Sequence, residues 1–141
     1  MKWLQFEIPG EPVAKGRARS FVRNGKIAHH TPDKTARYES RVALLAKVQM
    51  KGRPPMEGPL KLTVSAYLGI GSSWSKKRQL AAIEGQERPT KRPDIDNVVK
   101  AIKDGLNGIA WIDDSQVVDL VAGKQWSDVP RVFVSVRKVT A

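Results

Sequence analysis

The chain has 141 residues and carries 25 Lys and Arg against 14 Asp and Glu, which gives a formal net charge of +11. A chain of this length is typical of one domain with its own core, and its charge favours a polyanionic partner, such as nucleic acid or an acidic membrane surface, over a basic protein without a particular partner. The sequence contains no cysteine, which excludes disulfides, thiolate metal sites and cysteine nucleophiles.

The amino-terminal residues 1–10, MKWLQFEIPG, have one lysine followed by alternating apolar and polar residues. This pattern is not that of a secretory signal peptide, and it predicts a half-buried strand over residues 2–8 with Leu4, Phe6 and Ile8 on one side. The apolar runs elsewhere are too short to span a membrane. We therefore expect a cytoplasmic protein without a membrane partner.

The next segments predict a hairpin followed by a helix. Asn24 and Gly25 stand between two short apolar pairs, and these residue types favour the positive φ angles of a type I′ turn. Thr31, Pro32 and Asp33 are typical of a helix start, and the helix is expected to continue to about residue 50. Its expected buried residues are Tyr38, Val42, Leu45 and Ala46.

The remaining segments complete a single domain. Residues 60–68 alternate as a strand, residues 75–85 predict a short helix, and residues 116–126 and 131–139 predict two closing strands. Helices and strands are interspersed without strict alternation. We expect one α/β (α+β) domain over residues 1–141, with a mixed, mostly antiparallel sheet packed by helices.

An acidic window interrupts the basic chain after residue 92. The apolar residues Ile95, Val98, Val99, Ile102 and Leu106 have helical spacing and predict a helix of about 11 residues, with Asp96 expected as its N-cap and Gly108 as its stop. The proline before Asp94 favours extended backbone at this point. Because residues two apart share a face only on an extended stretch, Asp94 and Asp96 are predicted to converge just before the helix.

A second acidic pair, Asp113 and Asp114, precedes the first closing strand. Neighbouring residues at the entrance to a strand point to opposite faces, so only one of the two can join Asp94 and Asp96. The other would cap, or would hydrogen-bond from behind. The alternative interpretation is that both motifs are structural, with the first serving only as an N-cap and the second only as a turn.

Converging carboxylates raise one another's pKa and cost stability unless a cation neutralises them. Three aspartates without a nearby His or Cys are hard oxygen ligands that suit Mg²⁺ or Mn²⁺. Lys100 lies four residues after Asp96 on the same helix face, although this spacing is also common on ordinary helices. A carboxylate-held Mg²⁺ among cations is suited to phosphodiester hydrolysis.

Residues 92–120, RPDIDNVVKAIKDGLNGIAWIDDSQVVDL, resemble the signature of RusA-type Holliday junction resolvases. The shared pattern is K/R-P-D-x-D-N, a lysine four residues after the second Asp, a D-x-L-N/T block and W-x-D-D-x-Q-V. The resemblance extends to the amino-terminal IPGEPVAKGRAR and covers most of the chain. Pro is common in the family where this chain has Ala18, a minor departure outside the acidic motifs.

The resemblance implies a homodimeric, Mg²⁺-dependent enzyme of phage or bacterial origin that cuts four-way DNA junctions with paired nicks. It places the essential carboxylates, which are also the metal ligands, on Asp94, Asp96 and Asp114, and the essential lysine on Lys100. It places Asp113 at the less critical first position of the acidic pair.

Basic residues cluster in three further segments. Lys15, Arg17 and Arg19 alternate, so on a strand they would form a phosphate-binding strip, although an exposed hairpin edge is also often charged against aggregation. The helix at 75–85 begins with cations, which its dipole disfavours, so an external anion is expected there. The predicted DNA-binding residues are Lys15, Arg17, Arg19, Lys76, Lys77, Arg78, Lys91 and Arg92.

The aromatic and histidine residues give weaker predictions. Trp74, Trp111 and Trp126 are expected in the core or at its rim, with Trp111 the best candidate for stacking on a base because it adjoins the acidic pair. His29 and His30 are expected in a surface turn. The preferred interpretation is a junction-resolving endonuclease; the alternatives are a flap or branched-DNA nuclease and a DNA-binding protein without catalysis.

Overall fold

The computed structural model describes residues 3–16, 19–30 and 33–140. Its main sheet has the strand order β1-β6-β4-β5. The strands are β1 (Leu4–Pro9), β4 (Leu60–Gly69), β5 (Val117–Ser127) and β6 (Arg131–Lys138). β6 is antiparallel to both β1 and β4, whereas β4 and β5 are parallel. The predicted mixed, mostly antiparallel sheet is therefore confirmed.

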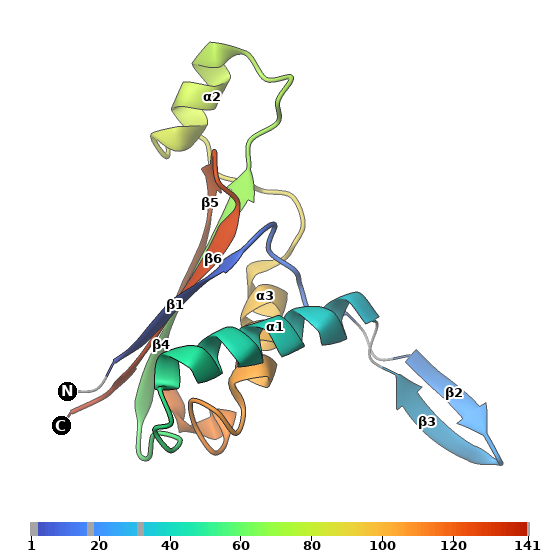
Figure 1. The fold of residues 1–141 in the computed structure, drawn as a ribbon. Helices are drawn as coiled ribbons and strands as arrows, with labels where there is room; N and C mark the ends of the chain where they lie inside the picture. Colours follow the sequence, from blue (N-terminus) through green and yellow to red (C-terminus); the bar gives the residue numbers. More distant parts are fainter. Residues whose placement is uncertain (1–2, 17–18, 31–32, 141) are drawn as a thin grey trace.

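Two helices, α1 (Asp33–Met50) and α3 (Ile95–Leu106), lie on one side of this sheet (Figure 1). Alternate residues of β1, β4 and β6 point toward them and are buried, because a strand presents every second side chain to one face. α1 contacts α3 and β1. The core strand residues include Leu4, Ile8, Leu60, Leu62, Val64, Val132, Val134 and Val136. The predicted α1 residues Tyr38, Val42 and Ala46 are buried and Leu45 is partly buried.

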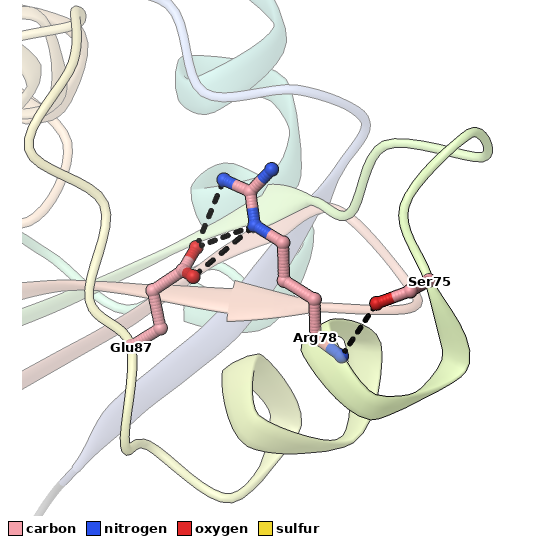
Figure 2. Close-up of polar contacts among 3 residues, drawn as sticks. All are labelled: Ser75, Arg78 and Glu87. Atoms are coloured by element: carbon pink, nitrogen blue, oxygen red, sulfur yellow. Dashed lines mark hydrogen bonds and ion pairs between the residues drawn. The ribbon is translucent and has the colours of Figure 1, made fainter.

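The short helix α2 (Lys76–Ile83) stands beyond the end of β4 (Figure 1). Ser75 is its N-cap and accepts a hydrogen bond from the Arg78 backbone N–H at 3.2 Å. The Arg78 guanidinium donates to both oxygens of Glu87 (Figure 2) and lies 3.5 Å from the centre of the Trp74 ring. The cations at this helix start are thus partly balanced within the chain.

The predicted hairpin is formed by β2 (Arg19–Arg23) and β3 (Lys26–His30), which pair antiparallel and extend away from the main sheet (Figure 1). Asn24 and Gly25 have φ angles of 52° and 74°, as a type I′ turn requires. His29 and His30 therefore belong to a strand rather than to a turn. The predicted helix-start residues Thr31 and Pro32 lie outside the described residues.

Within the part of the chain that the structure describes, no helix is both long and apolar enough to cross a membrane. Trp111 and Trp126 are buried and Trp74 is partly buried, as expected for core or rim residues. Trp111 is fully buried, so the prediction that it is the best candidate for base stacking was wrong: its ring packs in the core and its Nε1 donates to Asn107 Oδ1 at 2.6 Å.

Candidate active site

A groove of about 890 Å³ opens where the loop after β1 meets the starts of α1 and α3. It holds Asp94, one of the predicted metal ligands, beside the predicted DNA-binding residues Lys15 and Arg92. Lys34, at the start of α1, also lines it. Its walls are formed by residues 12–16, 34–35, 92–94 and 97. Acidic and basic side chains therefore share one concave surface.

Asp94 is the N-cap of α3, and the prediction that Asp96 would be the N-cap was wrong. Asp94 is extended, with a ψ of 137°, and its carbonyl accepts the first helical hydrogen bond, from Val98 N at 3.1 Å. Asp96 therefore lies in the first turn of the helix and not on an extended stretch. The Asp94 side chain makes no capping hydrogen bond, which leaves its carboxylate free for another ligand.

Lys124 of β5 fixes the backbone directly before Asp94. Its ammonium donates to the carbonyl of Lys91 at 2.8 Å and to that of Pro93 at 3.1 Å. The Lys124 carbonyl accepts from the Arg88 guanidinium at 2.8 Å, which ties the incoming chain to the same strand. The segment that carries Asp94 is thus fastened to the main sheet.

Lys15 lies in the loop after β1 rather than on a strand, contrary to the predicted strip, because β2 begins only at Arg19. Its Nζ is 2.5 Å from Glu39 Oε1 and 3.0 Å from Asp104 Oδ2. Burial acts to lower its pKa, but the hydrogen bonds and charges of Glu39 and Asp104 outweigh burial and raise the pKa of Lys15 above 10.5.

The other predicted DNA-binding residues occupy different settings. Lys76 and Lys77 are exposed in the first turn of α2, whereas Arg78 is bonded to Glu87. Lys91 lies near the Trp126 ring, 5.3 Å from its centre, and Arg92 lines the groove. Arg17 lies outside the described residues, and Arg19 begins β2.

Asp113 and Asp114 have different roles in the short 3₁₀ helix η1 (Asp114–Gln116). Asp113 is the N-cap, and its carboxylate accepts hydrogen bonds from both the hydroxyl and the backbone N–H of Ser115. The Ser115 hydroxyl, followed by the backbone bond, holds the pKa of Asp113 below its usual value. The expectation that one of this pair would cap is confirmed, and Asp114 is not used in this way.

Asp94 is the N-cap of α3, whereas Asp114 follows the other end of this helix, in η1. The 12 residues of α3 span about 18 Å. The main sheet gives a similar separation. η1 leads into the start of β5 at Val117, and Lys124 lies seven residues further along this strand, about 23 Å away. Lys124 is the residue that holds the Asp94 segment. Within the described residues no three His, Asp or Glu side chains are grouped closely enough to hold a metal ion. A single copy of the chain therefore does not gather Asp94, Asp96 and Asp114 at one point.

Lys100 is exposed on α3, four residues after Asp96 and so on the same face of the helix. A phosphate near Asp96 would therefore be within the range of a mobile ammonium. The structure places this pair beside the groove end of α3 rather than beside η1.

Sequence reasoning missed the structural role of Gln116. Its Oε1 accepts from the backbone N–H groups of Ile112 and Asp113, and its Nε2 donates to the carbonyls of Met56 and Gly58. One side chain thus fixes both η1 and the loop before β4. The capping-box pattern, an Asp followed three residues later by Gln, is the sequence signal that could have revealed it.

Comparison with known proteins agrees with these features. A model of the endodeoxyribonuclease RusA family matches residues 9–137. The chain is 43% identical over 143 residues to YqaN of Bacillus subtilis (strain 168), a protein described as uncharacterized, and the match covers all of both chains. It is 27% identical over 141 residues to the crossover junction endodeoxyribonuclease rusA of Lactococcus phage r1t, covering 96% of this chain and 97% of the phage protein. The chain therefore belongs to the RusA family of endodeoxyribonucleases, enzymes that hydrolyse phosphodiester bonds within DNA.

Proposed function

We propose that this endonuclease resolves four-way DNA junctions by paired nicks and depends on a divalent metal ion, Mg²⁺ with Mn²⁺ as a substitute. The family match over residues 9–137 is the observation that carries the proposal. The four-way junction is inferred as the substrate from the name of the phage relative. The net charge of +11 supports a polyanionic substrate, because basic residues release counterions when they bind phosphates.

Asp94, Asp96 and Asp114 are the proposed metal ligands. Carboxylate oxygens are the ligands that Mg²⁺ prefers, and neither the Asp94 nor the Asp114 carboxylate caps a helix. When bound, a divalent ion supplies charge stabilisation for phosphodiester hydrolysis. Lys100, on the Asp96 face of α3, would stabilise the negative charge that develops on the attacked phosphate.

The separation of Asp94 from Asp114 supports a homodimer in which each site takes Asp94 and Asp96 from one copy and Asp114 from the other. β5 is an edge strand of the main sheet, and it exposes Val118, Leu120 and Val121 by 59%, 51% and 52%. Exposed apolar residues on a free edge favour pairing with another strand. If the β5 strands of two copies paired antiparallel, the start of one β5, which follows η1 and Asp114, would lie near the end of the other β5. That end carries Lys124, which holds the Asp94 segment.

The metal-ligand assignment is tested with Asp94→Asn. Cleavage of a synthetic four-way junction should fall by more than about a hundredfold, since the loss of a mere outer partner of a metal ligand already costs about 10–100-fold. Junction binding should persist or tighten, because the substitution removes a negative charge. Cleavage at the wild-type rate would refute the metal site.

The shared site is tested by mixing two inactive proteins, Asp94→Asn and Asp114→Asn. A mixed dimer would contain one site with both substitutions and one intact site, so nicking should return on mixing. If each site belonged to one chain, every site in the mixture would carry a substitution and the mixture would stay inactive. Light scattering of each variant provides the control for dimer formation.

The substrate is tested by offering the wild-type protein a four-way junction, a flap and a linear duplex side by side with Mg²⁺. Paired, symmetric nicks in the junction are the expected result. Preferential cutting of the flap would assign a branched-DNA nuclease instead, and binding without cutting of any substrate would assign a DNA-binding protein without catalysis.

A further inference from the structure

The outward face of α1 carries a row of cations that no motif identifies. Lys34, Arg37 and Arg41 are all exposed, and their spacing of i, i+3 and i+7 places them on one face of the helix. The adjoining face, which includes Tyr38 and Val42, is buried against α3 and β1. Of the two acidic residues in α1, Glu39 is turned toward Lys15, and Asp33 lies at the very start of the helix.

In the sequence of α1, Arg41 has no acidic residue three or four positions away, and Arg37 has only Asp33. Solvated helix faces commonly place acidic residues three or four positions from basic ones, which stabilises the helix. Here Arg37 and Arg41, four residues apart, repel each other instead. Arg41 uses one guanidinium N–H to reach the Pro9 carbonyl at 3.0 Å, and Arg37 reaches the Asp33 carbonyl at 3.4 Å. Toward the residues that the structure describes, most of the five N–H donors of each guanidinium stay available.

The row is continuous with the groove, because Lys34 belongs to both. From Lys34 to Arg41 the row extends about 10 Å along α1. A DNA strand places one phosphate in about every 3.4 Å of helix axis, so about three phosphates of one strand lie within this length. A backbone leaving the groove would thus meet a matching set of cations.

We propose that the outer face of α1 is a DNA-contact surface in which Lys34, Arg37 and Arg41 bind the backbone phosphates of one duplex arm. The inference rests on the proposed function for the identity of the substrate, a branched DNA whose arms are duplex. Phosphate contacts position the DNA and carry no base information, so this surface sets affinity and orientation and not sequence preference.

The test compares two double variants that remove the same charge, Arg37→Gln/Arg41→Gln on the row and Lys61→Gln/Lys138→Gln on β4 and β6. Binding of a four-way junction and of a linear duplex is measured by fluorescence anisotropy at several salt concentrations without divalent metal. Loss of two phosphate contacts should reduce the salt slope of log K by about 1.8 for both DNAs, while the control double variant should keep the wild-type slope.

Two further measurements separate this inference from the proposed catalysis. Arg37→Lys/Arg41→Lys should retain most of the binding, which shows that charge and not folding is responsible. Single-turnover cleavage at saturating protein should keep its wild-type rate in Arg37→Gln/Arg41→Gln, with only the half-saturating concentration raised. Equal losses in the row and control variants, or wild-type binding by the row variant, would overturn the α1 surface. An inactive wild-type protein would instead refute the proposed function and leave the binding result standing.

Discussion

The ammonium of Lys15 lies 3.0 Å from Asp104 Oδ2, and this contact joins the loop after β1 to the last turn of α3. The same ammonium reaches Glu39 of α1, while the Lys15 backbone N–H donates to the Asn97 carbonyl at 2.9 Å. One residue thus fastens the loop to both helices that flank the groove. Its position makes Lys15 a structural support of the groove wall before it can be a phosphate contact.

Replacing Lys15 with Met should lower the free energy of unfolding by about 1–3 kcal/mol, because two partly buried carboxylates lose a charged donor. Urea denaturation measures the change. Lys47→Met, which removes an exposed charge from α1, is the control and should change stability little. Equal stability of the Lys15 and Lys47 variants would show that the pair contributes nothing beyond general charge.

The stabilisation by Lys15 should also depend on pH. Because Glu39 and Asp104 raise its pKa in the folded state above 10.5, the contribution is complete below pH 10.5 and is lost as the pH rises through the folded-state pKa. The difference in unfolding free energy between wild type and Lys15→Met should therefore shrink in alkaline solution. Burial raises the pKa of Tyr38 to about 12, but this residue titrates in both proteins and cancels in the difference.

The neighbours Asp113 and Asp114 should respond differently to the same change. Asp114→Asn should abolish cleavage as Asp94→Asn does, since Asp114 is a proposed ligand. Asp113→Asn should keep most of the cleavage at neutral pH, because Asn is also a good N-cap and can accept from Ser115. Cleavage assays with matched circular dichroism spectra decide the point, and equal losses in both variants would contradict the division of roles.

Much of the fold could be predicted because local sequence signals and burial agree in most elements. The alternation of β4, the Asn24-Gly25 turn and the apolar spacing of α3 each identify an element correctly. The start of α3 was misplaced because Asp94 and Asp96 are equally good N-cap residues by type. Only the position of the first helical hydrogen bond, from Val98 to Asp94, distinguishes them.

The arrangement of the candidate site was harder to predict, because the number of residues between two positions does not by itself give their distance in space. The short stretch from Asp94 to Asp113 includes the full length of α3, so residues that share one motif lie at its two ends. The same motif also mixes proposed metal ligands with structural residues. Trp111, Asn107 and Gln116 hold the loops in place through their own hydrogen bonds.

The crossing of α1 and α3 depends on Gly105. A Cβ at this position would lie 2.9 Å from Val42 Cβ and 3.0 Å from the Glu39 carbonyl oxygen, which is too close without a shift of the helices. Gly105→Ala should therefore lower the unfolding free energy by about 1–3 kcal/mol, although Ala normally favours a helix by about 1 kcal/mol over Gly.

Gly123→Ala on β5 is the matched control for Gly105→Ala, because its added Cβ would meet only the end of the Arg88 side chain, at 3.5 Å. It should be tolerated in the same urea denaturation experiment. If Gly105→Ala proved as stable as wild type, the close packing of the two helices at this point would be disproved.

Lys124 provides the last prediction, because it acts on Asp94 only through the backbone. Lys124→Met removes the donor to the carbonyls of Lys91 and Pro93, so amide hydrogen exchange over residues 88–98 should become faster. Cleavage should fall by about 10–100-fold, the usual cost of losing an outer support of a metal ligand, while junction binding persists. Lys124→Arg retains N–H donors that can reach both carbonyls, so it should keep part of the slow exchange and part of the cleavage rate. Lys138→Met, with the same loss of charge, should change neither. Faster exchange without slower cleavage would mean that Lys124 holds this segment but does not position Asp94. Unchanged exchange would mean that Lys124 does not hold this segment.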